Sequence, residues 1–407
     1  MAFSRLGLDA CLVQKVASMG YTQPTPIQEA AIPEALAGRD VIGCAQTGTG
    51  KTAAFILPIL QRISNKRGVK ALIVTPTREL ASQIEEVAVT CGRATRHRTV
   101  AIYGGVSYRP QESKLRSGVD LVVATPGRLL DLMESRTVNL SGVEILVLDE
   151  ADRMLDMGFW PDVRRIISAL PKERQTLLFS ATMSPKTLNV ISSTLSEPVT
   201  INIGRPATPV KLINQIVYPV GATDKNNLLL EILKQAEMPR VLIFARTKRR
   251  VDRLCDTLTR NGLAAAPIHS GLTQAQRQRT LADFKRGRVR FLVGTDIVAR
   301  GIDVENISHV VNYDIPTNPE DYVHRIGRTA RAGEKGAAIS LLGVEELSDF
   351  RQIESFIDQK LPCEYLESFT YQNKFVLSSA PKRVMPKSRG GFQGRRSGRP
   401  FVPAGRR

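Results

Sequence analysis

The sequence predicts an α/β protein with two domains, each a parallel sheet flanked by helices, and a disordered basic C-terminal tail. Short apolar runs such as 143–148 are nearly continuous, as expected of parallel strands that are covered on both faces. A glycine-rich segment at 45–52 joins one such run to a helix-like segment. After a stretch of prolines and small residues, strand and helix patterns alternate again, which indicates a second α/β domain of similar size.

Changes in composition predict the domain boundaries. We expect a first domain over 1–204, a linker over 205–212, a second domain over 213–371 and the tail over 372–407. The tail has ten Lys or Arg residues, no acidic residue and no apolar periodicity. Such a segment cannot bury a core, so we expect it to be disordered. Its positive charge should bind nucleic acid phosphates without sequence preference.

Charge and cysteine usage narrow the class of protein. The chain has 57 basic and 39 acidic residues among 407, a net charge of +18. This excess favours a polyanion as partner, with nucleic acid first and an anionic membrane second. The five cysteines form no C-x-x-C pair, which is typical of small core residues in a reducing compartment. No apolar run approaches the roughly 18 residues of a membrane span, so we expect a cytoplasmic protein without membrane contact.

The segment A-Q-T-G-T-G-K-T resembles a phosphate-binding loop between a strand and a helix. Glycines let backbone N–H groups converge on phosphate oxygens, and the helix N-terminus adds partial positive charge. Lys51 would reach the β and γ phosphates and Thr52 would offer its hydroxyl to Mg²⁺. A plain Gly/Thr turn is the alternative, because Ala45 stands where the general pattern has Gly. The candidate nucleotide contacts here are Ala45, Gln46, Thr47, Gly48, Thr49, Gly50, Lys51 and Thr52.

A pair of carboxylates follows the predicted strand at 143–148. Asp149 and Glu150 would lie at the carboxyl end of a buried strand, where open α/β sheets bind ligands. Asp149 would hold Mg²⁺, and Glu150 would orient and deprotonate the attacking water. The alternative is an acidic strand–helix junction in which Asp caps the next helix. A phosphate loop followed by such a pair indicates hydrolysis of ATP or GTP.

A proline-rich segment precedes the phosphate loop. Pro24 and Pro26 favour a rigid extended backbone. Gln28 carries the amide that a bidentate contact to adenine needs, and Tyr21 offers a flat stacking surface. An ordinary proline-rich turn is the alternative interpretation.

Together these motifs closely resemble the DEAD-box ATP-dependent RNA helicases. The order is Tyr21 with P-T-P-I-Q at 24–28, A-Q-T-G-T-G-K-T, P-T-R-E-L at 76–80, T-P-G-R at 125–128, D-E-A-D at 149–152 and S-A-T at 180–182. The resemblance covers roughly residues 1–370, and this family has Ala at position 45. It implies two tandem RecA-like domains, the first with a Q motif, ATP and Mg²⁺ as cofactors, and single-stranded and duplex RNA as partners. The chain looks most like the bacterial RhlE-like members, which implies ribosomal precursors or RNA-decay proteins as further partners and a monomeric core.

The resemblance also assigns expected roles to individual residues. In the second domain, Arg325 and Arg328 resemble arginine fingers, and their spacing of three would place them on one helix face. Gly301 and Asp303 resemble nucleotide contacts, while Asp152, Ser180, Thr182 and His324 resemble residues that couple hydrolysis to strand separation. The expected RNA contacts are Pro76, Thr77, Arg78, Gly104, Gly105, Thr125, Arg128, Arg246, Gln274, Arg277, Thr295 and Asp296.

Two other functions compete with an unwinding enzyme. An RNA annealer would rely on its tail, so deletion of 372–407 should then abolish activity, whereas an enzyme core should retain residual unwinding. An ATP-gated clamp would rarely turn over, so Glu150→Gln should leave it largely intact but abolish unwinding. The motif set favours the enzyme.

Overall fold

The computed structural model describes residues 2–45, 48–64, 67–183, 185–203, 213–235, 238–296, 304, 307–330 and 336–372. The predicted linker at 205–212 and the tail from 373 onward lie outside these ranges. The predicted domain boundaries therefore stay predictions. Within the described part, no helix is both long enough and apolar enough to cross a membrane.

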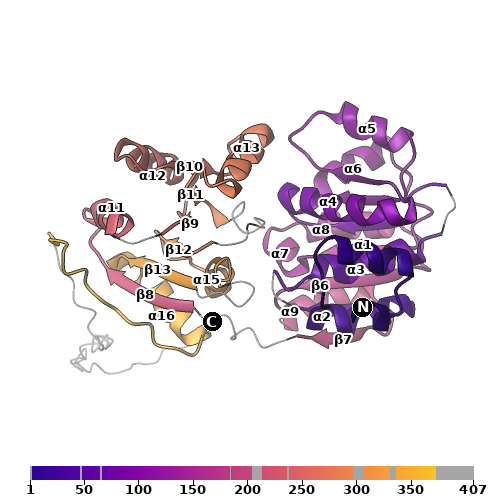
Figure 1. The fold of residues 1–407 in the computed structure, drawn as a ribbon, viewed down its shortest axis with the longest axis horizontal. Coiled ribbons are helices and arrows are strands. Elements are labelled where there is room, and N and C mark those ends of the chain that lie inside the picture. The colour runs from indigo at the N-terminus through magenta and orange to yellow at the C-terminus, as the bar shows by residue number, and fades with distance from the viewer. Residues whose placement is uncertain are drawn as a thin grey trace, which may run out of the picture. The chain divides into compact units, whose positions relative to one another are not determined.

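A parallel sheet organises the first domain (Figure 1). Its seven strands follow the order β3-β4-β2-β5-β6-β1-β7. Its strands are β1 (Val41–Cys44), β2 (Ala71–Val74), β3 (Thr99–Ile102), β4 (Leu121–Ala124), β5 (Ile145–Asp149), β6 (Gln175–Ser180) and β7 (Val199–Asn202). Strand β1 lies between β6 and β7, with Val41 opposite Leu177 and Val199. All strands run the same way, so the loops after β1, β2, β4, β5 and β6 emerge at one edge.

Helices cover both faces of this sheet. They are η1 (Ala2–Leu6), α1 (Ala10–Ser18), α2 (Pro26–Leu36), α3 (Lys51–Arg62), α4 (Arg78–Thr95), α5 (Tyr108–Arg116), α6 (Pro126–Glu134), α7 (Ala151–Asp156), α8 (Trp160–Ser168), α9 (Pro185–Ile191) and η2 (Ser192–Thr194). Successive strand residues feed opposite faces, so Ile73 and Val147 join one apolar cluster while Leu72 and Leu146 join the other. Burial on both faces explains the nearly continuous apolar runs of the sequence.

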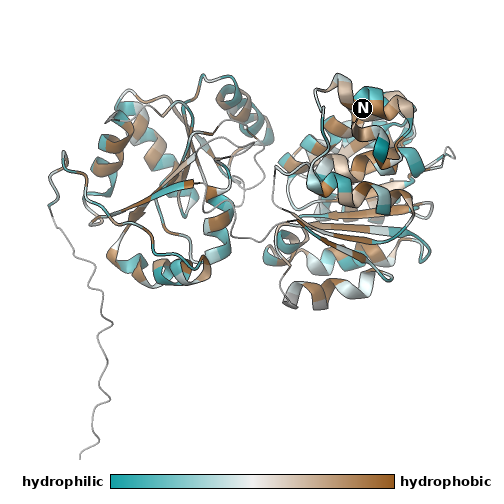
Figure 2. Ribbon diagram, turned by 60° about the horizontal axis from the view of Figure 1, so that its bottom comes forward, coloured by the Kyte–Doolittle hydropathy of each residue, from teal (hydrophilic) through white to brown (hydrophobic). Residues whose placement is uncertain are grey.

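The second domain repeats this arrangement with a six-stranded parallel sheet, in the order β10-β11-β9-β12-β13-β8. Its strands are β8 (Ile213–Pro219), β9 (Val241–Phe244), β10 (Ala265–Ile268), β11 (Phe291–Gly294), β12 (His309–Asn312) and β13 (Gly336–Leu342). The described helices are α11 (Lys225–Gln235), α12 (Lys248–Arg260), α13 (Gln274–Lys285), α15 (Pro319–Ile326), η3 (Val344–Glu346) and α16 (Leu347–Phe356). Figure 2 shows the hydrophobic strands inside and hydrophilic residues on the outer faces of the helices. The predicted α/β class with two parallel sheets flanked by helices is confirmed.

Candidate functional site

The predicted phosphate loop lies between β1 and α3. Gly48 and Gly50 both have φ of 88°, in the left-handed region that favours glycine. A Cβ on Gly50 would also collide with Nε2 of Gln28. This turn therefore needs glycine for both its backbone angle and its close packing. Gln46 and Thr47 lie outside the described residues.

Lys51 and Thr52 open α3 directly after this turn. Lys51 is only 7% exposed, and its Nζ donates to the carbonyl of Ala45 at 2.8 Å. The ammonium group is thus folded over the loop, where it would meet a bound phosphate. Thr52 is half-buried in the first turn of the same helix.

Asp149 ends β5 and is almost completely buried. Burial raises its pKa to about 7, although the nearby Lys51 lowers it. A bound cation would offset this cost by stabilising the ionised carboxylate. Among the described residues no group of three or more His, Cys, Asp or Glu side chains could hold a metal. A carboxylate and a hydroxyl are hard oxygen ligands, so Asp149 and Thr52 fit Mg²⁺, which proteins usually bind through one or two side chains together with substrate phosphates.

Glu150 has an unusual backbone conformation at the start of α7. Its φ of 54° and ψ of 51° place it in the left-handed region, which is costly for a residue with a Cβ. Its carboxylate pairs with Nη1 of Arg153 at 3.0 Å, and both side chains are buried. Glu150 occupies the N-cap position but makes no side-chain cap hydrogen bond. Glu150 therefore does not act as a side-chain cap of α7.

Asp152 joins the acid segment to the end of β6. Its Oδ2 accepts hydrogen bonds from the N–H and the hydroxyl of Thr182, both at 2.9 Å. Ser180 Oγ accepts from the N–H of Asp152 at 3.3 Å and donates to the carbonyl of Thr182 at 2.7 Å. Burial would raise the pKa of Asp152, but His324, Lys51 and these hydroxyls lower it overall. Asp152, Ser180 and Thr182, three of the four residues predicted to couple hydrolysis to strand separation, thus form one hydrogen-bonded unit.

The two candidate adenine contacts have different surroundings. Tyr21 is 42% exposed. Gln28 is buried, its Nε2 donates to the carbonyl of Gly50 at 3.0 Å, and its Oε1 accepts from the N–H of Thr25 at 3.0 Å. Gln28 therefore ties α2 to the phosphate loop, a role that its spacing in the sequence did not reveal.

The predicted RNA contacts of the first domain gather where β2, β3 and β4 end. Thr77 and Thr125 are the N-cap residues of α4 and α6, and Pro76 is buried beside Thr77. The guanidinium of Arg78 lies so close to Gly105 that a Cβ there would collide with it, while Gly104 adjoins the same group. Arg128 is only 7% exposed, and its Nη2 donates to the carbonyl of Val106 at 2.9 Å.

Arg325, the first predicted arginine finger, is buried inside the second domain. It is 1% exposed, and its Nε and Nη2 form a bidentate pair with Asp296 at 2.6 and 2.8 Å. Its Nη1 donates to Asn312 and to the carbonyl of Asp314. Arg328 is 3% exposed, and its Nε donates to the carbonyl of His324. In this conformation both guanidiniums are buried among groups of their own domain rather than exposed at its surface.

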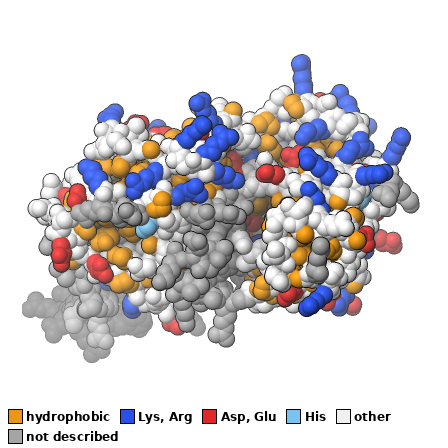
Figure 3. Space-filling view, viewed as in Figure 1, with side chains coloured by type: hydrophobic (Ala, Val, Ile, Leu, Met, Phe, Trp, Pro, Cys, Tyr) orange, Lys and Arg blue, Asp and Glu red, His pale blue; other side chains and the backbone are white. Residues whose placement is uncertain are grey.

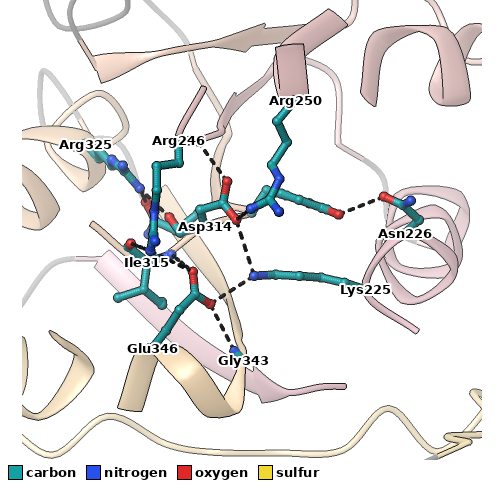
Figure 4. A network of polar contacts seen from close by, with 11 residues as sticks. Lys225, Asn226, Arg246, Arg250, Asp314, Ile315, Arg325, Gly343 and Glu346 are labelled. Atoms are coloured by element: carbon teal, nitrogen blue, oxygen red, sulfur yellow. Dashed lines mark hydrogen bonds and ion pairs between the residues drawn. The ribbon is translucent and has the colours of Figure 1, made fainter. Parts of the chain in front are cut away.

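Arg246 belongs to a charged network after β9 and β12. Figure 4 shows Lys225, Arg246 and Arg250 converging on the buried carboxylates of Asp314 and Glu346. Lys225 Nζ lies 2.9 Å from Glu346 and 3.5 Å from Asp314, and Arg250 Nη1 lies 2.5 Å from Asp314. Arg246 reaches Glu346 at 3.3 Å and the carbonyl of Ile315 at 3.2 Å. The backbone N–H of Arg246 also donates to Oδ2 of Asp314 at 2.8 Å, and the side chain stays 46% exposed.

The remaining predicted contacts of the second domain are mostly buried. Nη2 of Arg277 lies 2.5 Å from Glu79, and Gln274 Nε2 donates to the same carboxylate at 3.2 Å. Thr295 is 9% exposed. Gly301 and Asp303 lie outside the described residues. Sequence reasoning missed Glu79, Asp314 and Glu346, because their importance rests on partners that are distant along the chain.

Exposed basic side chains gather over α12 and α13 (Figure 3). They include Lys248, Arg249, Arg253, Arg260, Lys285 and Arg286. Lys248 and Arg249 begin α12 two and three residues after Arg246. This surface agrees with the basic charge of the chain body and would attract a polyanion.

The fold and the first-domain site define a nucleoside triphosphatase built from two parallel α/β domains. A model of the DEAD/DEAH box helicases matches residues 25–191, and a model of the helicase conserved C-terminal domain matches residues 224–333. The ATP-dependent RNA helicase CshA of Listeria monocytogenes is 44% identical over 375 residues, which are 92% of this chain and 72% of that protein. CshA of Bacillus cereus is 43% identical over 360 residues, 88% of this chain and 69% of that protein. The chain belongs to the DEAD-box family of ATP-dependent RNA helicases.

Solved structures agree with this assignment. Dbp5 of S. cerevisiae bound to RNA and ADP BeF3 matches with a TM-score of 0.83 at 33% identity, covering 89% of this chain and 95% of that one. Mss116p bound to ssRNA and AMP-PNP matches with a TM-score of 0.82 at 31% identity, covering 90% and 79%. These matches confirm the predicted tandem RecA-like fold. The resemblance to RhlE-like members and the roles of single residues stay predictions.

Proposed function

We propose that this chain couples ATP binding and hydrolysis to local, non-sequence-specific RNA unwinding or RNP remodelling. The residues that follow the carboxyl ends of the strands in the two sheets would perform this work. The observation that carries the proposal is the continuous unit from the phosphate loop to β6. Lys51 follows β1 and Asp149 ends β5, the two strands that flank β6, and Lys51 is close enough to lower the pKa of Asp149. Asp152 is hydrogen-bonded to Thr182 after β6. A change at the phosphates can thus be transmitted to the segment after β6.

The nucleotide site would use groups that still have hydrogen-bond donors or acceptors available for the ligand. An amide has two donor hydrogens and two acceptor lone pairs, so Gln28 can read adenine while it holds Gly50. Tyr21 would stack on the base, the backbone of 45–50 would bind phosphate oxygens, and Lys51 would bind the β and γ phosphates. Asp149 and Thr52 would hold Mg²⁺, which supplies charge neutralisation on the phosphates. Glu150 would orient and deprotonate the attacking water.

The RNA site would rest on backbone contacts. Arg78, Gly104, Gly105, Thr125 and Arg128 would serve in the first domain, and Arg246, Gln274, Arg277, Thr295 and Asp296 in the second, with Pro76 and Thr77 shaping the first edge. Phosphate contacts position the strand without reading its sequence, and 2′-OH contacts would select RNA. Arg325 and Arg328 would act on the γ-phosphate after a rearrangement that frees them, with Gly301, Asp303 and His324 completing the second-domain contribution.

The cellular part of the proposal extends the family resemblance. We propose a monomeric core that acts in the cytoplasm on ribosomal precursors or with RNA-decay proteins. The tail at 372–407 would hold RNA near the core through its positive charge.

Steady-state ATP hydrolysis with and without single-stranded RNA tests the proposal, with GTP and DNA as controls. We expect strong stimulation by RNA with ATP alone, and Lys51→Ala should remove the stimulated rate and so exclude a contaminating ATPase. Rapid hydrolysis without RNA would contradict the coupling between RNA and ATP hydrolysis. Equal use of GTP would contradict the selection of adenine.

A further inference from the structure

Tyr108 is an exposed aromatic residue at the sheet edge that carries the predicted RNA contacts of the first domain. It begins α5, three residues after Gly105, and its side chain is 42% exposed. Among the described residues, the other large hydrophobic side chains that are exposed lie elsewhere, at Tyr21, Leu188, Val344 and Phe356. A single exposed aromatic residue is ordinary on a protein surface, but this one lies beside the predicted RNA contacts.

Two groups fix the position of the Tyr108 ring. The Cζ atom of Arg128 lies 3.6 Å from the ring centroid, so the guanidinium is stacked against one face. The hydroxyl donates to Oδ2 of Asp131 at 2.8 Å. The ring is therefore held in place before any ligand arrives, and its exposed surface lies away from Arg128. A pre-positioned flat surface loses little conformational entropy on binding.

Arg128 is well placed to support the ring. It is 7% exposed, and its Nε and Nη1 are buried without a hydrogen-bond partner. Its Nε lies 3.9 Å from Asp131, and its Nη2 is bound to Val106. A buried guanidinium with so few acceptors gains most from the π-face above it, so Arg128 and Tyr108 stabilise each other.

The groups around the ring suit a nucleic acid strand. Arg109 is exposed beside Tyr108, and the guanidinium of Arg78 lies against Gly105 at the same edge. Cationic groups that follow a backbone, together with an aromatic surface for a base, are the usual components of single-strand binding sites.

We propose that Tyr108 is a stacking platform for one nucleobase of the bound single strand, with Arg128 and Asp131 as positioning residues. The inference rests on the proposed function, because it assumes that RNA runs along this edge. It adds a second role, support of the ring, to the RNA contact expected of Arg128. Since every base has a π-face, the platform adds affinity without sequence preference.

Equilibrium binding of a labelled RNA oligonucleotide to the full chain tests the platform, measured with and without a non-hydrolysable ATP analogue. Tyr108→Ala should weaken the analogue-dependent binding about 5- to 100-fold, as for other base-stacking aromatics. Tyr108→Phe keeps the ring and should stay within about threefold of wild type, since it loses one hydrogen bond at most. Phe356→Ala, an exposed aromatic of the second domain, is the matched control and should change nothing.

An oligonucleotide of abasic sites separates stacking from backbone contact. Wild type and Tyr108→Ala should bind it equally, because no base remains to stack. An equal loss on abasic and normal RNA would overturn the platform, as would unchanged binding by Tyr108→Ala. Tighter binding by Tyr108→Ala would show that the ring blocks access of RNA to Arg128. That result would likewise overturn the platform. If wild type shows no analogue-dependent RNA binding at all, the proposed function itself fails.

Discussion

The carboxyl ends of the central strands differ sharply between the two sheets. At the end of β5, Asp149 is buried with a pKa raised to about 7 by burial, and Glu150 is held in a left-handed conformation. After β12, Asp314 is equally buried but lies within 3.5 Å of both Lys225 and Arg250. Among the described residues of the first domain, no basic side chain is paired with Asp149, so a ligand that carries a cation would stabilise its ionised form. In the second domain, the basic side chains of Lys225 and Arg250 already neutralise Asp314. On the proposed function, similar folds would thus provide a reaction site in one domain and an internally paired support in the other.

The largest expected effect tests the chemical role of the first edge. Glu150→Gln removes the carboxylate that would take a proton from water, so ATP turnover with RNA should fall about 10²- to 10⁴-fold. Phosphate released at fixed time points would measure the turnover rate. Glu134→Gln changes a carboxylate that is 65% exposed and should leave turnover unchanged. Normal turnover in Glu150→Gln would mean that this edge performs different chemistry.

The next effect concerns stability in the second domain. Glu346→Gln breaks the pair with Lys225 and leaves a buried ammonium with a weaker partner, so the free energy of unfolding should fall by about 3 kcal/mol. Denaturant unfolding followed by circular dichroism would measure this. The neighbouring Glu345→Gln is the control, because Glu345 is exposed and should change stability by less than about 0.5 kcal/mol. Equal effects of the two variants would contradict the internally paired support.

A pair of glycines separates backbone strain from close packing at the phosphate loop. Gly50 and Gly20 have φ of 88° and 86°, but only at Gly50 would a Cβ meet other atoms, chiefly the Gln28 amide. Gly50→Ala should therefore weaken ATP binding at least about tenfold, which corresponds to about 1.4 kcal/mol. Gly20→Ala should alter stability slightly and leave ATP affinity intact. Fluorescent nucleotide titration distinguishes them, and similar ATP affinities would refute the packing argument.

The smallest expected effect compares one half-buried histidine in each domain. Burial lowers the pKa of both His97 and His309, so each favours its neutral form in the folded state. Their contribution to stability is present above the unfolded pKa of about 6.5 and is lost as pH falls through the lower folded value. His309→Gln should therefore lose less thermal stability than wild type between pH 7.5 and 5. A parallel decline in the two proteins would show that His309 does not titrate in this range.

The sequence predicted what depends on local pattern. Continuous apolar runs predicted the parallel strands, and glycine and carboxylate motifs located the phosphate loop and Asp149. The pairing of Arg325 with Asp296 was not predictable, because the two residues lie 29 positions apart and meet only once β11, β9 and β12 are assembled. The same holds for Tyr108 and Arg128, which come together from the starts of α5 and α6.

The left-handed backbone of Glu150 has a consequence for protein engineering. A residue with a Cβ in this conformation costs about 1 kcal/mol or more relative to glycine. Directed evolution that rewards only heat resistance should therefore favour Gly or Asn at position 150, and the most heat-resistant descendants should be the least active ones. A selection for robust variants of this enzyme must include turnover in its criterion from the first round.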